Sequence, residues 1–214
     1  IHSLKREKLI VENINVDELV YSRLDFTDNE LHFSKEQNNY LRNKKEILMC
    51  IDPNWMPYEK IEKGKHIGIT SEYIKLFSKT IGLPIRLVET HTWVQSLEYI
   101  KLKKCDILAL ASKTPTRLKY LNYSDPYLKF PIVLATKVDK LFITDIKEIL
   151  EEKKIAIVEG YSLGENLKKK HVNNKIIDVS SVEAGMAMVS RGEVFGFLGA
   201  MPPIAHHLQK EYAS

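Results

Sequence analysis

A short segment that follows an apolar run combines the residue types that bind an anion. Ser112, Thr114 and Arg117 come directly after residues 106–110, which we predict to form a strand. Thr114 suits the N-cap of a helix and Pro115 its first position, so free backbone N–H groups would face whatever lies beyond the strand. Arg117 adds a guanidinium that can hold a carboxylate through two parallel hydrogen bonds. The segment predicts an anion site, although a capped surface helix with a solvated arginine fits it equally well.

The two tryptophans of the chain occupy positions that suit the walls of a cleft. Trp55 lies in a loop that contains Pro and Asn after the apolar run 47–51, and Trp93 opens a predicted helix. Flat apolar side chains suit a small organic ligand. Either tryptophan alone would also suit the edge of a core, which is a common place for Trp.

Residues 160–164, Gly-Tyr-Ser-Leu-Gly, have the form of a nucleophile elbow between a strand and a helix. Ser162 would then be a hydrolase nucleophile, with Asp178 and His206 or His207 following in the order of a triad. We favour a simpler interpretation, in which the glycine forms a turn and Ser162 is a helix N-cap at a second anion-binding helix start. A motif of this length does not supply a triad by itself.

Composition and cysteine usage exclude several other classes of protein. The chain has 214 residues, is 44% hydrophobic and 28% charged, and carries a net charge of +4, which argues against disorder and nucleic-acid binding. Its apolar runs are strand-sized, so no membrane span is predicted, and because it begins at Ile1 without a signal peptide we interpret it as a piece of a longer protein. Cys50 and Cys105 lie in apolar runs and are predicted to be buried free thiols. The sequence contains no metal-binding spacing and no cofactor motif, so neither a metal ion nor a cofactor is expected.

Along the chain, a polar segment precedes alternating strands and helices. Residues 1–44 lack Gly and Pro and contain one capping box, at Ser34, so we predict a linker with a short helix. Predicted strands then occupy 47–51, 85–88, 106–110, 131–136, 155–158, 175–179 and 194–198. Predicted helices occupy 71–81, 94–100, 145–152, 162–170, 182–189 and the segment from 203 onward. This alternation predicts an α/β fold with mainly parallel sheets, in two lobes at 45–137 and 138–214, with any ligand in the cleft between them.

Several short stretches, taken in order, resemble the extracytoplasmic solute-binding proteins of family 3, the polar amino-acid type. The resemblance is closest to the Venus-flytrap sensor domains of transmembrane histidine kinases and diguanylate cyclases, and it runs from about residue 34 to the C-terminus. The matching stretches are FSKEQxxYL at 33–41, IDPNWMPYE at 51–59, GITSEY at 68–73, residues 93–107, SxTxxR at 112–117, YSDPYL at 123–128, IAIVEG at 155–160 and SRGE at 190–193.

The resemblance implies a two-lobed periplasmic-binding-protein fold and assigns roles to the residues above. Aromatic rings at Trp55 and Trp93 would flank the ligand, Ser112 and Arg117 would bind its carboxylate, and the loop at 161–162 would close from the second lobe. It thereby reinterprets the nucleophile-elbow match as a ligand loop. The expected ligand-binding residues are Asp52, Trp55, Tyr58, Trp93, Leu110, Ala111, Ser112, Thr114, Arg117, Tyr161 and Ser162.

The sequence departs from this family in two places. Amino-acid-binding members carry an acid after the strand at 194–198 to hold the ligand ammonium, whereas this chain has Gly199 and Ala200 there. Asp52 is the better-placed substitute and Glu159 the other. We therefore expect a carboxylate ligand without an amino group or, second, an amino acid held through Asp52. The chain also ends where the family would still return to the first lobe.

These inferences together predict a sensor domain without catalytic activity on the periplasmic side of the membrane. It would close on a small anionic ligand through a hinge transition and signal to an output domain in its parent chain. Whether the domain forms a homodimer is left open by the sequence. The nearest alternative is the substrate-binding protein of an ABC amino-acid transporter. A serine hydrolase that uses Ser162 is the alternative from another class, and a periplasmic dehydratase on the same fold is a third.

Overall fold

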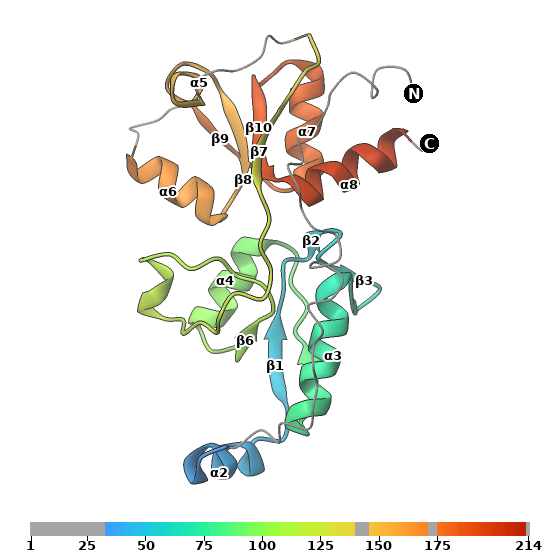
Figure 1. The fold of residues 1–214 in the computed structure, drawn as a ribbon, viewed down its shortest axis with the longest axis vertical. Helices are drawn as coiled ribbons and strands as arrows, with labels where there is room; N and C mark the ends of the chain where they lie inside the picture. The colour runs from blue at the N-terminus through green and yellow to red at the C-terminus, as the bar shows by residue number, and fades with distance from the viewer. Residues whose placement is uncertain (1–32, 140–145, 171–174, 213–214) are drawn as a thin grey trace, which may run out of the picture.

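The computed structural model describes residues 33–139, 146–170 and 175–212, which form two α/β lobes stacked along the long axis of the molecule (Figure 1). A short helix, α2 (Lys35–Asn43), extends from the far end of the first lobe. Its predicted capping box is confirmed, because Ser34 and Gln37 exchange side chain-to-backbone hydrogen bonds of 3.2 and 2.8 Å.

The first lobe is built on a parallel sheet of three short strands with β1 in the centre. Its elements are β1 (Ile47–Cys50), β2 (Asn54–Trp55), β3 (Glu59–Glu62), β4 (Lys65–Ile67), α3 (Ile69–Ile81), β5 (Ile85–Leu87), α4 (Trp93–Lys101) and β6 (Ile107–Leu108). The strand order is β5-β1-β6, and α3 and α4 supply Ile74 and Ile100 to the two small cores of this lobe. Strands β2, β3 and β4 form a separate antiparallel sheet within the loop that follows β1, which the sequence analysis did not predict.

The second lobe contains a four-stranded sheet in the order β7-β10-β8-β9. Its elements are β7 (Ile132–Thr136), α5 (Ile146–Glu152), β8 (Ile155–Val158), α6 (Ser162–Lys170), β9 (Ile176–Val179), α7 (Val182–Arg191), β10 (Gly196–Ala200) and α8 (Met201–Tyr212). Strand β8 is buried along its whole length, as expected for a central strand of a parallel sheet that helices cover on both faces. The mixed α/β fold with mainly parallel sheets is the one predicted.

One strand belongs to a different lobe from the one we expected. Strand β7 was predicted as the fourth strand of the first lobe, but it pairs antiparallel with β10, from Gly196 opposite Thr136 to Ala200 opposite Ile132. Apolar alternation shows that a segment is a strand but not which strand it joins. The division into a linker at 1–44 and lobes at 45–137 and 138–214 remains a proposal, and this pairing moves the crossing between lobes to before Ile132.

The cysteine prediction was wrong. Cys50 at the end of β1 and Cys105 just before β6 form a disulfide, with Cα atoms 5.8 Å apart, and neither residue is free. The two residues lie 55 positions apart in sequence, and only the parallel pairing of β1 with β6 brings them together. Both side chains are buried, so the disulfide also belongs to the small core beneath α4.

Candidate ligand-binding site

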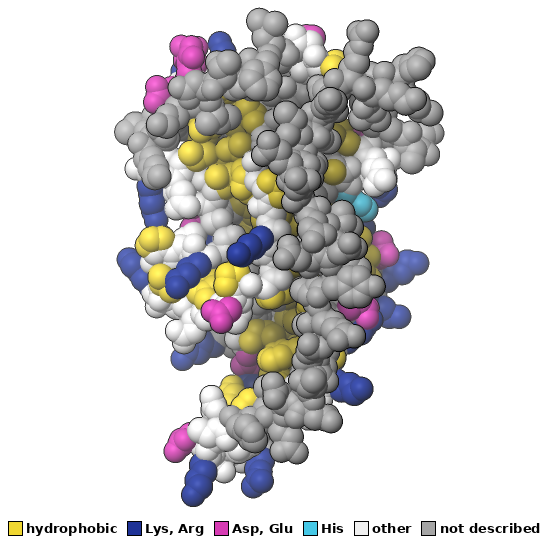
Figure 2. Space-filling model, in the orientation of Figure 1, with side chains coloured by type: hydrophobic (Ala, Val, Ile, Leu, Met, Phe, Trp, Pro, Cys, Tyr) yellow, Lys and Arg dark blue, Asp and Glu magenta, His cyan; other side chains and the backbone are white. Residues whose placement is uncertain are grey.

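A cavity of about 1220 Å³ lies where the two lobes meet. On the face drawn in Figure 2, hydrophobic side chains lie along the middle of both lobes, and Lys and Arg side chains lie beside them near the centre as well as at the edges. The structure brings nine of the eleven predicted ligand residues to the cavity wall. They are Asp52, Trp55, Trp93, Leu110, Ala111, Ser112, Arg117, Tyr161 and Ser162. Tyr58 and Thr114 do not line the cavity, and both are buried behind it.

The chain that carries Arg117 folds as a tight turn rather than as the predicted α-helix. Thr114 Oγ1 does accept a hydrogen bond from the backbone N–H of Arg117 at 3.2 Å, but only a 3-10 helix of three residues, Arg117–Lys119, follows. The residues that follow soon after include Asn122, Ser124, Asp125 and Pro126, which favour turns and disfavour further helix. The predicted helix N-terminus is therefore absent here, and the anion-binding capacity of this segment rests on the arginine side chain.

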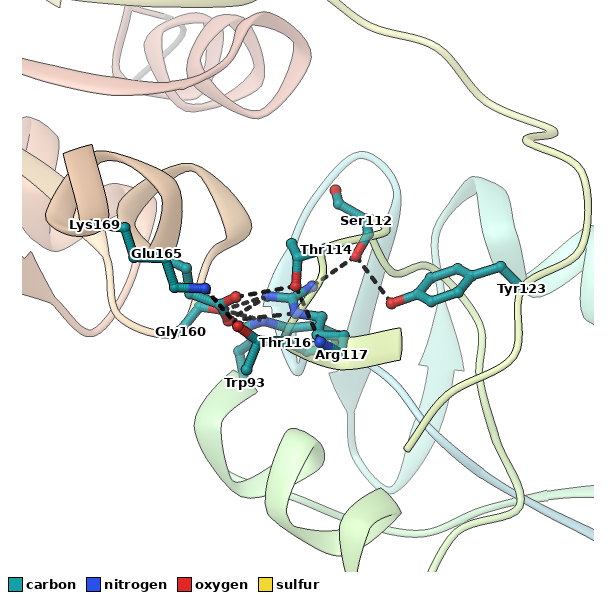
Figure 3. A network of polar contacts seen from close by, with 9 residues as sticks. All are labelled: Trp93, Ser112, Thr114, Thr116, Arg117, Tyr123, Gly160, Glu165 and Lys169. Atoms are coloured by element: carbon teal, nitrogen blue, oxygen red, sulfur yellow. Dashed lines mark hydrogen bonds and ion pairs between the residues drawn. The ribbon is translucent and has the colours of Figure 1, made fainter. Parts of the chain in front are cut away.

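The Arg117 guanidinium is buried between the lobes and has partners in both of them (Figure 3). In the first lobe Nη1 donates to the carbonyl oxygen of Ser112 at 3.2 Å. In the second lobe Nη2 donates to the carbonyl oxygen of Gly160 at 2.7 Å, and Nε and Nη2 both donate to Oε1 of Glu165, at 3.3 and 3.1 Å. A buried guanidinium requires a counter-ion, and Glu165 provides it.

Sequence reasoning missed Glu165 and the role of the Gly160 carbonyl. Glu165 lies in the first turn of α6, one turn after the predicted loop, where an acid usually complements the helix dipole and remains solvated. The one signal in the sequence was that Glu165 lies close to the loop that we expected to face Arg117. The sequence does not show how the two lobes pack against each other, so it could not predict that Glu165 contacts Arg117.

Trp93 joins the lobes at the same point. Its Nε1 donates to the carbonyl oxygen of Gly160 at 3.1 Å, and the Arg117 guanidinium carbon lies 5.8 Å from the centre of its ring, within cation–π range. Gly160 has φ +76°, and a Cβ built on it would lie 3.1 Å from Cγ2 of Val94 in the first lobe. A glycine therefore lets the backbone of the second lobe approach Trp93 and Arg117 closely.

Asp52 directly follows the apolar residues of β1 and faces the second lobe. Its Oδ1 accepts from the backbone N–H of Asn54 at 2.9 Å, and its Oδ2 accepts from the hydroxyl of Tyr161 at 2.7 Å. Burial raises the pKa of Asp52 to about 6, and the nearby Glu183 carboxylate also raises it, whereas the two hydrogen bonds lower it. Behind it the fully buried Glu59 accepts from the backbone N–H of Asp52 at 2.8 Å.

Trp55 lies at the centre of an aromatic cluster that spans the lobes. Its ring centre is 4.9 Å from that of Tyr58, 5.4 Å from that of Phe130 and 5.9 Å from that of Tyr161 in the second lobe. Its Nε1 is buried and, among the residues that the structure describes, has no hydrogen-bond partner. An unpaired buried donor at a cavity wall is available to a ligand acceptor.

The serine motif does not assemble a triad in the structure. Helix α6 begins at Ser162 itself, so Ser162 is the first helical residue and not the N-cap that we predicted. The carboxylate of Asp178 pairs with Lys168, and within the described part of the chain no hydrogen bond joins Ser162 to Asp178, His206 or His207. The geometry that a hydrolase needs is thus not formed.

The position of the expected ammonium-binding acid is apolar. Gly199 and Ala200 lie in β10 and line the cavity, and a Cβ on Gly199 would lie 2.8 Å from Cε1 of Phe197. Glu159, the second substitute we considered, is exposed and does not line the cavity. Within residues 33–139, 146–170 and 175–212 no cluster of side chains could hold a metal ion, and none of the helices there is long and apolar enough to cross a membrane.

A two-lobed α/β fold with a cavity between the lobes and a buried arginine at its wall defines a solute-binding protein. Residues 47–203 match the bacterial extracellular solute-binding proteins, family 3, and the chain belongs to this family. Among curated relatives, it is 25% identical over 170 residues to the membrane-bound lytic murein transglycosylase F of Alcanivorax borkumensis and 19% identical over 186 residues to the virulence sensor protein BvgS of Bordetella pertussis. These matches cover 77% and 86% of this chain but only 36% and 15% of the relatives.

Solved structures of binding proteins and of sensor domains share the fold. A histidine kinase sensor domain with similarity to periplasmic binding proteins superimposes with a TM-score of 0.74 at 16% identity, over 80% of this chain and 75% of that one. The holo form of ArgBP from T. maritima gives a TM-score of 0.68 at 18% identity, over 81% of this chain and 76% of that one. The chain therefore has the fold that solute-binding proteins share with such sensor domains.

Proposed function

We propose that this chain is a sensor domain that binds a small carboxylate-bearing ligand in the cavity between its lobes and closes around it. One observation carries the proposal: the buried Arg117 guanidinium lies at the cavity wall, with hydrogen-bond partners from both lobes. A ligand carboxylate that binds Arg117 would lie at the interface between the lobes and shift the equilibrium between their open and closed arrangements. Trp55 and Trp93 line the same cavity and would contact the rest of the ligand.

The charges around the cavity favour a carboxylate without an amino group. Gly199 and Ala200 offer no acid to an ammonium. Asp52 is already engaged by Tyr161, and its raised pKa means that the cavity disfavours the ionised form. An ammonium in this cavity would have to compete with Tyr161 for the Asp52 carboxylate, whose charge is already disfavoured by burial. An amino acid held through Asp52 remains the second possibility.

A role in sensing is supported by the likeness to BvgS and to the histidine kinase sensor domain. The likeness to ArgBP leaves a transporter binding protein as the alternative. An extracytoplasmic location is supported by the buried Cys50–Cys105 disulfide, because structural disulfides persist in oxidising compartments. The output domain and the membrane tether would lie in the parent chain.

A thermal-shift screen that pairs each amino acid with its deaminated analogue tests the proposed ligand class. The deaminated carboxylates should raise the melting temperature at least as much as the amino acids do. For any ligand found, Arg117→Ala should weaken binding measured by calorimetry by tens to thousands of fold, since truncating one partner of a buried charge pair costs about 2–5 kcal/mol. Lys119→Ala, at an exposed position nearby that does not line the cavity, is the control and should leave affinity unchanged. Stabilisation by amino acids alone that survives Asp52→Asn, or unchanged affinity in Arg117→Ala, would contradict the proposal.

A further inference from the structure

The Arg117 side chain is already bound by a carboxylate that belongs to the protein. Glu165 Oε1 accepts from Nε and Nη2 of Arg117, and Glu165 Oε2 accepts from the Thr114 hydroxyl at 3.3 Å. Both oxygens of a carboxylate on the second lobe are thus bound by groups of the first lobe (Figure 3). A guanidinium and a hydroxyl are the donors that a carboxylate ligand would use at this place.

The guanidinium has little capacity left for a second carboxylate. Of its five N–H groups, one on Nε and both on Nη2 are used by Glu165 and Gly160, and one on Nη1 is used by Ser112. The Arg117 side chain is 2% exposed and that of Glu165 is 25% exposed. An external carboxylate can therefore reach the two donors that Glu165 occupies only if Glu165 leaves them.

Helix α6 presents two side chains, not one, to the turn that carries Arg117. Lys169, one turn after Glu165, donates to the hydroxyl of Thr116. Residues four apart lie on one face of a helix, so this face of α6 contacts the first lobe over a full helical turn. The Glu165 contact is thereby part of an extended interface between the lobes.

We propose that Glu165 is a built-in carboxylate ligand of Arg117, which closes the lobes without an external ligand and which an external carboxylate must displace. The inference rests on the proposed function, because it concerns the same carboxylate site. It makes Glu165 the residue that decides which carboxylates bind: affinity is the difference between the contacts of the external carboxylate and those of Glu165. A simple monocarboxylate gains little free energy by replacing Glu165 on Arg117. A ligand therefore needs further contacts with the cavity wall in order to displace Glu165.

Small-angle scattering and an acetate titration on Glu165→Ala test the inference. Without a carboxylate, the variant leaves a buried guanidinium uncompensated in the closed state, so its radius of gyration should exceed that of the wild type. Acetate should then bind the variant at least about tenfold more tightly than the wild type and return the radius to the wild-type value. Glu165→Gln keeps the shape of the side chain and removes its charge, so this variant should also be more open than the wild type. It replaces the alanine variant in the test if that variant unfolds.

Glu183→Gln is the matched control, since Glu183 also bridges the lobes, by accepting from Asn54 Nδ2 at 3.0 Å, but does not touch Arg117. It should keep the wild-type response to acetate. A radius in both Glu165 variants equal to that of the wild type would overturn the inference, and so would equal acetate affinity in the wild type and Glu165→Ala. Larger radii with no acetate binding to any protein would support Glu165 as the closing contact and overturn Arg117 as a carboxylate site, so the inference and the proposed function can fail separately.

Discussion

Two buried charged groups of opposite sign lie at the cavity wall, and the protein treats them differently. Arg117 cannot lose its proton, so its burial requires a carboxylate, which Glu165 supplies. Asp52 can gain a proton, and the cavity shifts its pKa upward instead of providing a cation. The buried charges at the cavity wall thus include a fixed positive charge with a counter-ion and a negative charge that a fall in pH can remove.

Asp52 should make folding stability depend on pH in a defined window. Its pKa is about 6 in the folded protein, above the ordinary aspartate value of 3.8, so the folded state binds the proton more tightly than the unfolded state does. Protonation of Asp52 therefore increases the free energy of unfolding as pH falls from about 6 to about 4, and this contribution is absent above that window. Thermal unfolding of the wild type and Asp52→Asn should show the wild type gaining stability relative to the variant between pH 7.5 and pH 4.5.

The comparison between the two proteins removes from the result those titrating groups that do not interact with Asp52. His66 has its pKa lowered to about 4 by burial, which acts in the opposite direction in the same window, and buried Glu59 has a raised pKa. His66 is present in both proteins, so its contribution cancels to first order in the difference. The Asp52 charge raises the pKa of Glu59, so the difference reports the titration of Asp52 together with its effect on Glu59. A difference in melting temperature that stays constant from pH 7.5 to pH 4.5 would show that Asp52 does not titrate in this window.

At the scale of elements, sequence signals predicted the helices and strands well because each is a local property. The glycines that end α3 and α7, Gly82 and Gly192, have the left-handed conformation expected of helix C-termini. Strands β2, β3 and β4 were missed, since they are short and largely polar and carry no apolar run. Most cavity residues were found because they follow strands or begin helices, positions that the chain order alone reveals.

What could not be predicted are relations between distant elements. The partner of β7, the disulfide between Cys50 and Cys105, and the contact between Glu165 and Arg117 all depend on how strands and lobes pack. An acid in the first turn of a helix is commonly solvated, and a cysteine in an apolar run is commonly a buried free thiol. The sequence contains no local sign that would distinguish these roles from the observed ones.

The disulfide that joins the end of β1 to the segment before β6 should stabilise the first lobe. It closes a loop across 55 residues, so replacing both cysteines with alanine should lower the free energy of unfolding by about 2–4 kcal/mol. Chemical denaturation of the two proteins measures this difference. The denatured but unreduced wild type should contain no reactive thiol in an Ellman assay and two after reduction. Two reactive thiols before reduction would contradict the assignment.

At the scale of the whole molecule, contacts at several points hold the lobes together, and both tryptophans lie among them. Trp93 donates to Gly160 across the lobes, and Trp55 contacts Tyr161 through its ring. Trp93 is 6% exposed in this arrangement. Since the chain has only these two tryptophans, its intrinsic emission reports on the interface between the lobes.

Arg117→Ala should therefore shift the tryptophan emission to longer wavelength without ligand. The substitution removes the hydrogen bonds from Arg117 to Gly160 and Glu165, and water should then reach Trp93 as the lobes separate. The same substitution in a Trp93→Phe background should give a smaller shift, because Trp55 then reports alone from its aromatic cluster. Lys119→Ala, which is exposed and does not line the cavity, should leave the spectrum unchanged. If Arg117→Ala folds normally and emits like the wild type, contacts other than those of Arg117 hold the lobes closed, and Asp52–Tyr161 and Asn54–Glu183 are the hydrogen-bonded pairs to change next.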